Sequence, residues 1–373
     1  MRIKHLIVLA VALCMGVTAA QAAKKQKKVA QAAPVAQKVP LGVWDDCRRD
    51  NNVDSIRHWI SVLYDAGIRE FYMCGKPEQI GLYLDVVKPY GDAHVHAWMF
   101  TMDACRDSAA TYHHPEWFEV NRLGFNSRDY NPYVKHYRWL SPAVPEVHEF
   151  LKKKVDSYAS LEGLASVHLD FIRFNDVILG RGTQRDRFHI QQDTYRAEYD
   201  FGYHPLAIEK FKKQFGYSPL DLKDPWMSAE WLQFRYNEIT DLVNELTAEA
   251  HSKGVKMSAA VFPFPTRARM MVYQDWATWK VDIVCPMNYQ SFYLENVDWI
   301  KFSVENGIRE SFHHNTYISG IFVPNITADE IYHAAKISIE AGADGINFFS
   351  AAGLMRSAEK LATVRRLNEE YNK

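Results

Sequence analysis

The sequence lacks the motifs of several common enzyme classes. Its one Gly-x-Gly, in LGRGTQ (179–184), follows a predicted strand but opens no helix and lacks the spacing of a dinucleotide- or phosphate-binding loop. There is no Gly-x-Ser-x-Gly motif, and no cysteine stands in the sequence context of a nucleophile. We therefore expect no serine or cysteine nucleophile, and we expect the protein to work without a cofactor.

An excess of basic residues is also missing once the N-terminal segment is set apart. Residues 1–39 hold seven of the 44 Lys and Arg and none of the 45 Asp and Glu, which leaves the rest of the chain with a net charge of about −8. Nucleic acids are bound mainly through their phosphates, which require basic side chains. The mildly acidic body therefore argues against a nucleic-acid partner.

Cysteine is scarce, with five among 373 residues. Cys47, Cys74 and Cys105 each follow a predicted strand, and we predict one disulfide among these three. The sequence does not say which two would pair. Cys285 lies inside a predicted strand and is expected to be a buried thiol.

The first 39 residues differ in composition from the rest. A basic start, MRIKH, precedes LIVLAVALCMGV, an apolar run of 12 residues, well short of the roughly 20 that a membrane-spanning helix needs. Because Ala20-Gln21-Ala22 then follows, residues 1–22 are predicted to be a signal peptide. Residues 23–39 have five lysines and no aromatic residue, which predicts a flexible basic linker. We expect a protein exported to the periplasm or beyond, without a membrane span.

Residues 40–373 repeat one pattern, in which a short apolar strand is followed by a polar turn and an amphipathic helix. The predicted strands are 41–44, 68–74, 94–100, 165–172, 256–262, 282–288, 316–322 and 345–349. Helices such as 53–67 and 145–161 have apolar residues at helical spacing, and several end in glycine. Eight alternations of strand and helix predict an α/β fold, a single-domain (β/α)8 TIM barrel.

Two predicted connections are longer than turns. They run from 101 to 141 after the third strand and from 175 to 204 after the fourth. Loops this long in a compact domain are usually functional or disordered, and both of these are rich in aromatic residues. Both also follow strand C-termini, the end at which barrels build active sites. We predict that these two loops border the active site.

The fourth predicted strand contains polar and charged side chains, which are uncommon in a buried strand. In VHLDFIRFND (167–176), His168 and Asp170 share one face and Leu169 lies on the other. If the apolar face packs on helices, Asp170 points into the mouth of the barrel. A carboxylate there is costly unless it is paired or used. We favour a functional role for Asp170 over an internal ion pair with Arg173.

Several stretches resemble a known barrel family. These are HVHAWMF (94–100), HHPEWFEVNRLG (113–124) ahead of YRWLSPAVPEVHEFL (137–151), GLASVHLDFIRF (163–174) and YQDWATWKVDIVCPMNYQ (273–290). The chain resembles the glycosyl-hydrolase-like "family 10-like" barrels of bacteria, from about residue 40 to 355. The resemblance implies a (β/α)8 fold and a glycosidase acting on a carbohydrate substrate.

The chain departs from that family pattern at two places. It has Ser141 where the family tends to have Asn, and the loop RGTQRDRFHIQQDTYRAEYD (181–200) has an unusual composition. The resemblance therefore implies no particular sugar.

Glycoside cleavage needs two carboxyl groups across the scissile bond, one as acid and one as nucleophile or base. We predict Asp170 as the nucleophile or base and Asp103, after the third strand, as the acid. Glu198, Asp200 and Asp275 stay open as alternative partners.

Sugars stack their C–H faces on aromatic rings and offer hydroxyl groups to planar polar side chains. Residues of these kinds gather in and after the predicted strands. The predicted substrate-binding residues are Asp45, Asp46, His96, Trp98, His168, Arg173, Asn288 and Tyr289.

Two other functions fit some of the same residues. His94 and His96 on one strand, with His168 and Asp170 on the next, could bind a divalent metal and make the protein a metal-dependent hydrolase or deacetylase. A non-catalytic glycan-binding barrel, in which Asp170 binds a sugar hydroxyl, is the other alternative. The glycosidase prediction itself involves no metal.

Overall fold

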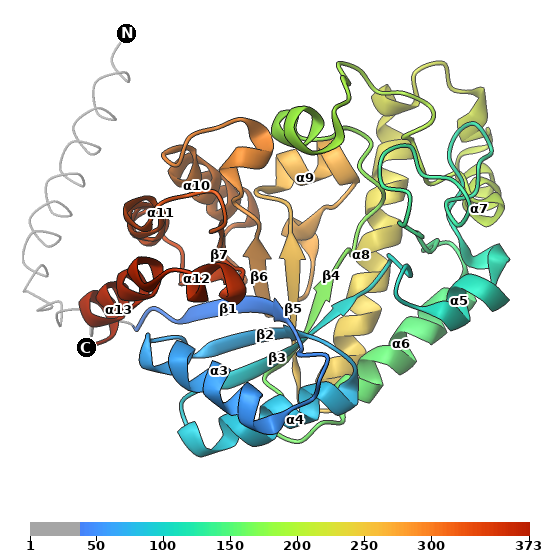
Figure 1. Cartoon of the computed structure of the whole chain (residues 1–373). Helices are drawn as coiled ribbons and strands as arrows, with labels where there is room; N and C mark the ends of the chain where they lie inside the picture. The colour runs from blue at the N-terminus through green and yellow to red at the C-terminus, as the bar shows by residue number, and fades with distance from the viewer. Residues whose placement is uncertain (1–37) are drawn as a thin grey trace, which may run out of the picture. The chain divides into compact units, whose positions relative to one another are not determined.

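A computed structural model describes residues 38–373 and shows a closed barrel of eight parallel strands in sequential order, surrounded by helices (Figure 1). The predicted (β/α)8 fold is confirmed. The compact unit spans Val39–Lys373. The predicted signal peptide, and the predicted linker up to residue 37, lie outside the described residues.

The observed strands lie within or close to the predicted ranges. They are β1 (Leu41–Asp46), β2 (Glu70–Cys74), β3 (His94–Phe100), β4 (Ser166–Asp170), β5 (Lys256–Val261), β6 (Ile283–Pro286), β7 (Thr316–Phe322) and β8 (Gly345–Phe349). The α-helices are α3 (Val53–Asp65), α4 (Pro77–Val87), α5 (Ser108–His113), α6 (Pro145–Ala159), α7 (Pro205–Phe215), α8 (Ala229–Ser252), α9 (Pro265–Val272), α10 (Trp299–Ser311), α11 (Ala328–Glu340), α12 (Ala351–Met355) and α13 (Ala358–Asn372). Within residues 38–373, no helix combines the length and hydropathy needed to cross a membrane.

Local sequence signals explain where the helices begin and end. The side chain of Asn52 accepts a hydrogen bond from the backbone N–H of Ser55 and so caps α3, as this residue type commonly does. A capping box of Thr327 and Glu330 starts α11. Gly216 ends α7 with φ of 83°, a conformation that favours glycine.

The barrel separates two cores. Outward-facing strand residues such as Val43, Phe71 and Val167 pack against the helices in the larger core. Inside the barrel, a smaller cluster contains Trp44 and Tyr72 among its aromatic residues. Because successive strand residues point to opposite faces, each strand supplies both cores.

The predicted disulfide is not found, and two of its three candidate cysteines pack in different cores. Cys47, Cys74, Cys105 and Cys285 are all free thiols. Cys47 packs in the outer core, whereas Cys74 lies in the interior cluster. The backbone N–H of Cys47 donates to the Cys74 carbonyl at 2.7 Å, so the two backbones are adjacent although the side chains pack in separate cores.

The two long loops are joined to each other. The backbone N–H of Gly202 donates to Glu119 Oε2 at 3.0 Å, and that of Arg122 donates to the Asp200 carbonyl at 2.9 Å. Phe201 also forms an isolated antiparallel bridge with the first loop. The loop after β3 and the loop after β4 therefore form one structure over the C-terminal end of the barrel.

Candidate active site

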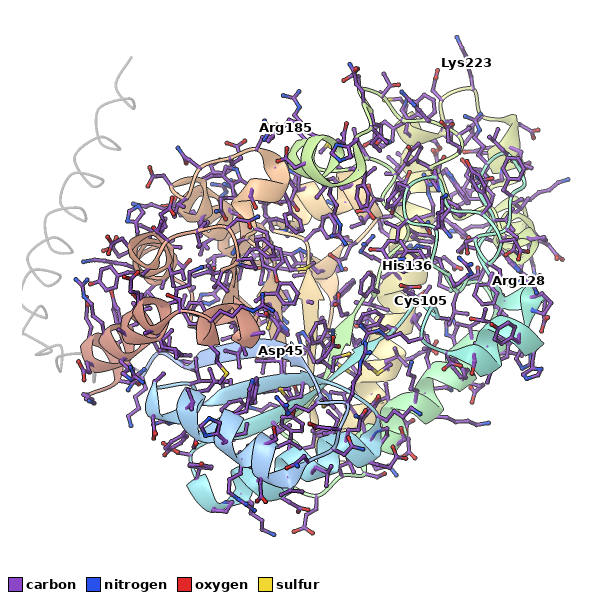
Figure 2. All side chains as sticks on the ribbon, viewed as in Figure 1. Asp45, Cys105, Arg128, His136, Arg185 and Lys223 are labelled. Carbon is purple, nitrogen blue, oxygen red and sulfur yellow. The ribbon has the colours of Figure 1, made fainter. Side chains whose placement is uncertain are left out.

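A cavity of about 470 Å³ opens at the C-terminal ends of the strands, between the two long loops. This volume is within the range of small-molecule sites. Its charged lining residues are Asp45, Asp46, Arg106, Asp170, Arg173, Asp176 and Arg187. Its aromatic lining residues are Trp44, Trp98, Phe100, Tyr133, Tyr137, Phe171, Phe188, Phe262, Tyr289, Phe292, Tyr293 and Phe349. Figure 2 shows Asp45 near the centre of the barrel and His136 on the first of the two long loops.

Asp170 is the last residue of β4 and lines this cavity. Its Oδ2 accepts a hydrogen bond from Trp98 Nε1 at 3.0 Å, and its Oδ1 accepts one from the backbone N–H of Phe171 at 2.7 Å. Burial raises the pKa of Asp170 to about 6, against the opposing effects of these donors and of Arg173. A carboxylate with this pKa is a stronger base than an ordinary aspartate and is still mostly ionised at pH 7.

The chain turns sharply just after Asp170. Phe171 has φ of 52°, in the left-handed region that bulky residues rarely adopt. Such conformations are costly and occur often at functional sites. The turn carries the chain from β4 into the second long loop and leaves Asp170 in the lining of the cavity.

Arg173 pairs with Asp176 rather than with Asp170. Its Nη1 lies 3.1 Å from Asp176 Oδ2, and both side chains are about nine-tenths buried. The hydroxyl of Tyr133 also donates to Asp176, and the Arg173 guanidinium lies 4.8 Å from the Trp139 ring centre. The internal ion pair considered for Asp170 is therefore made by a different carboxylate, and Asp170 is left without a salt-bridge partner within residues 38–373.

Asp45 and Asp46, at the end of β1, have different environments. Asp45 accepts backbone hydrogen bonds from Ala352 at 2.7 Å and from Asp46 at 2.9 Å, and burial raises the pKa of its carboxyl group. Asp46 is more exposed and forms an ion pair of 3.0 Å with Arg106. Of the two carboxyl groups, Asp46 is therefore held by an arginine and Asp45 by backbone N–H groups.

Asp103, the predicted acid, does not line the cavity. Its Oδ1 accepts hydrogen bonds from the backbone N–H groups of Cys105 at 3.1 Å and Arg138 at 2.9 Å. The side chain is buried, and burial raises the pKa of Asp103. These contacts fit a residue that holds the first long loop in place, and the predicted contact with substrate does not agree with this geometry.

His96 and His168 lie deeper in the barrel than predicted. Trp44 Nε1 donates to His168 Nε2 at 3.0 Å, so the other ring nitrogen carries the proton and donates to Ser258 at 2.8 Å. His96 lies 2.8 Å from Glu70 through Nε2. Both rings are buried and neither lines the cavity. The predicted substrate contacts of the two histidines are therefore not supported.

Asn288 also points away from the cavity, whereas its neighbour Tyr289 lines it. The Asn288 amide donates to Ser319 Oγ at 2.9 Å and accepts from Ser303 Oγ at 2.6 Å. Both partners are buried, and Ser303 belongs to α10. These contacts fix the chain just after β6, and Asn288 does not line the cavity in which the substrate contact was predicted.

The four residues proposed for a metal site do not converge. His94 begins β3 and is paired with Glu70 at 3.1 Å, at the end of the barrel opposite the cavity. His96 and His168 occupy the middle of their strands, and Asp170 ends β4. Among residues 38–373, no group of three or more potential metal ligands is gathered. The side chains named for the metal-dependent alternative therefore do not form a ligand set.

Several lining residues were not predicted from the sequence. Arg106, Tyr133 and Tyr137 come from the loop after β3, and Asp176 and Arg187 come from the loop after β4. The signal that could have pointed to them is the length and aromatic content of these loops. Of the alternative acids, Asp200, Asp275 and Glu198 pair with Arg235, Arg269 and Arg196 and do not line the cavity.

The sequence matches the family model described as glycosyl hydrolase-like 10 over residues 90–310. The matched region contains β3 to β6, both long loops and Asp170. The chain belongs to the glycosyl hydrolase-like 10 family. Among curated proteins, none matches this sequence.

Solved structures similar to this family member share its fold. The glycoside hydrolase domain of PgaB (BpsB) from Bordetella bronchiseptica has a TM-score of 0.64 at 10% identity, covering 87% of this chain and 98% of that one. The catalytic domain of a beta-amylase from Paenibacillus polymyxa has a TM-score of 0.60 at 10% identity, covering 91% and 98%. At this identity the likeness concerns the barrel fold alone.

Proposed function

We propose that this chain hydrolyses O-glycosidic bonds of a poly- or oligosaccharide in the cavity at the C-terminal end of its barrel. The observation that carries the proposal is Asp170, which lines an aromatic cavity, has no salt-bridge partner within residues 38–373 and has its pKa raised to about 6. Membership of the glycosyl hydrolase-like family supports it. Export from the cytoplasm is part of the same proposal and rests on the sequence of residues 1–22.

Asp170 acts as the nucleophile or base. The Trp98 indole N–H and the Phe171 backbone N–H fix its two oxygens, so the carboxylate has one defined orientation in the cavity. Precise placement of a reacting group contributes much of the rate enhancement of enzymes. Arg173, engaged by Asp176, stabilises negative charge near Asp170 without forming an ion pair with it.

Asp45 is the carboxyl group we propose as proton donor. Among the other acids of the cavity, Asp46 pairs with Arg106 and Asp176 pairs with Arg173. Asp45 has no such partner within the described part of the chain, and burial raises its pKa. Glycosidases use a carboxyl group with a raised pKa to protonate the leaving oxygen.

The aromatic wall supplies the sugar-binding surface. Trp98, held by its indole N–H to Asp170, is in edge contact with Phe349 at 6.3 Å between ring centres. Tyr289 stacks on Phe349 at 6.0 Å. Rings next to the catalytic carboxylate would bind the C–H face of the sugar whose bond is cleaved.

The test is release of reducing ends from a panel of plant, host and bacterial glycans by the full chain, with and without a chelator. We expect wild type to cleave at least one glycan and the chelator to have no effect. Asp45→Asn should lose activity on natural glycans but keep most of it on aryl glycosides, whose leaving groups need no proton. Asp129→Asn, which changes an exposed acid outside the cavity, is the matched control.

Two results would contradict the proposal. Absence of cleavage across the panel, together with binding of a glycan, would favour a non-catalytic barrel. Loss of cleavage on chelation, restored by a divalent metal, would favour the metal-dependent alternative.

A further inference from the structure

Two short segments of the loops that border the cavity carry a local excess of positive charge, although neither whole loop, 101–141 or 175–204, has more basic than acidic residues. Residues 131–138 and 180–190 contain five Lys or Arg and one acid, Asp186, although the chain beyond residue 39 has a net charge of about −8. Both segments contribute to the cavity wall, the first through Tyr133 and Tyr137 and the second through Thr183 and Arg187. The basic residues are Lys135, Arg138, Arg181, Arg185 and Arg187.

Most of this charge is not neutralised by the protein itself. Arg185 pairs with its neighbour Asp186 at 2.6 Å. Arg138 donates to two backbone carbonyl groups of its own loop, both at 2.7 Å. Within residues 38–373, Arg187 has no carboxylate within salt-bridge distance, and its guanidinium lies over the ring of Phe188 at 5.3 Å. Lys135 and Arg181 are exposed and likewise form no salt bridge among the described residues.

Among residues 38–373, Arg187 is the basic residue of the cavity wall that has no carboxylate partner. Asp46 is taken by Arg106 and Asp176 by Arg173. Asp45 and Asp170 accept hydrogen bonds from the protein, and they are the proposed proton donor and nucleophile or base. A neutral sugar would give the Arg187 guanidinium no counter-charge, whereas a carboxylate or sulfate can bind it with two parallel hydrogen bonds.

We propose that the substrate of this cavity is a glycan that carries anionic groups, either carboxylates or sulfate esters, and that Arg187 binds one of them. Lys135, Arg138 and Arg181 attract the same chain as it crosses the rim. The inference rests on the proposed function, because it specifies the substrate class of the same site. It also gives a role to the loop whose composition departs from the family pattern.

The experiment measures binding with the full chain carrying Asp170→Asn, so that turnover does not enter. Two matched pairs of probes differ only in charge: polygalacturonan against its methyl ester, and dextran sulfate against dextran. We expect at least one charged probe to bind ten-fold or more tightly than its neutral match. We also expect this preference to shrink between 20 and 200 mM salt, since exposed charges are screened. The pair that shows the preference identifies carboxylate or sulfate as the ligand.

Variants then assign the preference to Arg187. Arg187→Gln should weaken binding of the charged probe about ten-fold, and Arg187→Lys should weaken it less. Lys223→Gln removes one positive charge from an exposed position outside the cavity (Figure 2). This variant should bind the charged probe with unchanged affinity. Equal binding of charged and neutral probes, or an unchanged affinity in Arg187→Gln, would overturn the inference. A single-stranded oligonucleotide that binds as tightly as the best charged glycan would also overturn it.

The experiments distinguish failure of the anionic-substrate inference from failure of the glycosidase proposal. Cleavage of neutral glycans alone by wild type would refute the anionic substrate and leave the glycosidase proposal intact. Charge-selective binding without cleavage of the same glycan would refute the glycosidase proposal instead.

Discussion

The buried ion pair between Arg235 of α8 and Asp200 holds the second long loop on the barrel. Both side chains are 1% exposed, and Arg235 Nη1 lies 2.5 Å from Asp200 Oδ1. Asp200 also accepts hydrogen bonds from Tyr203 at 2.8 Å and Tyr273 at 2.9 Å. The Arg235 guanidinium lies 3.7 Å from the centre of the Tyr273 ring. Removing one partner therefore leaves a charge in a site closed to water.

The expected cost follows from this burial. Asp200→Asn leaves the Arg235 guanidinium uncompensated and should lower the free energy of unfolding by about 3–5 kcal/mol. Arg235→Met should cost about 3 kcal/mol, because the two tyrosine hydroxyls still stabilise Asp200. The double variant should cost less than the sum of the two by about 1–3 kcal/mol, since both act on one interaction.

Urea unfolding followed by circular dichroism measures all three values. Asp186→Asn breaks an exposed pair and should change the free energy of unfolding by less than about 1 kcal/mol. Single-variant costs below about 1 kcal/mol, or strictly additive costs in the double variant, would refute the reasoning.

Three further outcomes are expected. If Asp170 is the base, kcat/KM should fall as the pH drops through about 6, the pKa to which burial raises this group, and a profile flat from pH 5 to 8 would contradict that role. Burial also raises the pKa of Glu119 from 4.5 to about 8, so the unfolded chain releases this proton at lower pH than the folded one. The free energy of unfolding should therefore fall as the pH rises from 4.5 to about 8, by up to about 1.4 kcal/mol per pH unit. In Glu119→Gln, the free energy of unfolding measured in urea should depend less steeply on pH. Gly202→Ala should cost more than about 1 kcal/mol in the same assay, because Gly202 has φ of 112° and a Cβ there would lie 2.8 Å from Arg235 Cδ.

The barrel could be predicted because its signals are local. Each strand is a short apolar run, and each helix has apolar residues at helical spacing with a cap or a glycine at its end, as in α3 and α7. Eight such units leave little choice of architecture. Strand ends then give part of the cavity directly, which is why Asp45, Trp98 and Asp170 were predicted at positions that line it.

The sequence predicted which face of a strand a side chain lies on better than it predicted how deep in the barrel the side chain lies. Alternation correctly placed His168 on the inner face with Asp170, but two residues along a strand move a side chain about one layer further into the barrel. At that depth His168 contacts Trp44 and Ser258 rather than the cavity.

Loop residues escaped prediction because contacts distant in sequence place them. Asp176 reaches the cavity beside Tyr133, a residue of the other loop, and the two loops are joined through Gly202 and Glu119. Asp103 follows β3 as an acid at a strand end should, yet its carboxylate is turned to backbone N–H groups of its own loop. No periodicity in the sequence carries this information.

The role of Asp170 is tested by measuring turnover and binding of the Asp170→Asn variant side by side. On a glycan that wild type cleaves, we predict a kcat lowered by several orders of magnitude, an affinity within a few-fold of wild type and a variant that stays folded at the assay temperature. A variant that still turns over at a rate near wild type would contradict the assignment of Asp170 and with it the proposed mechanism.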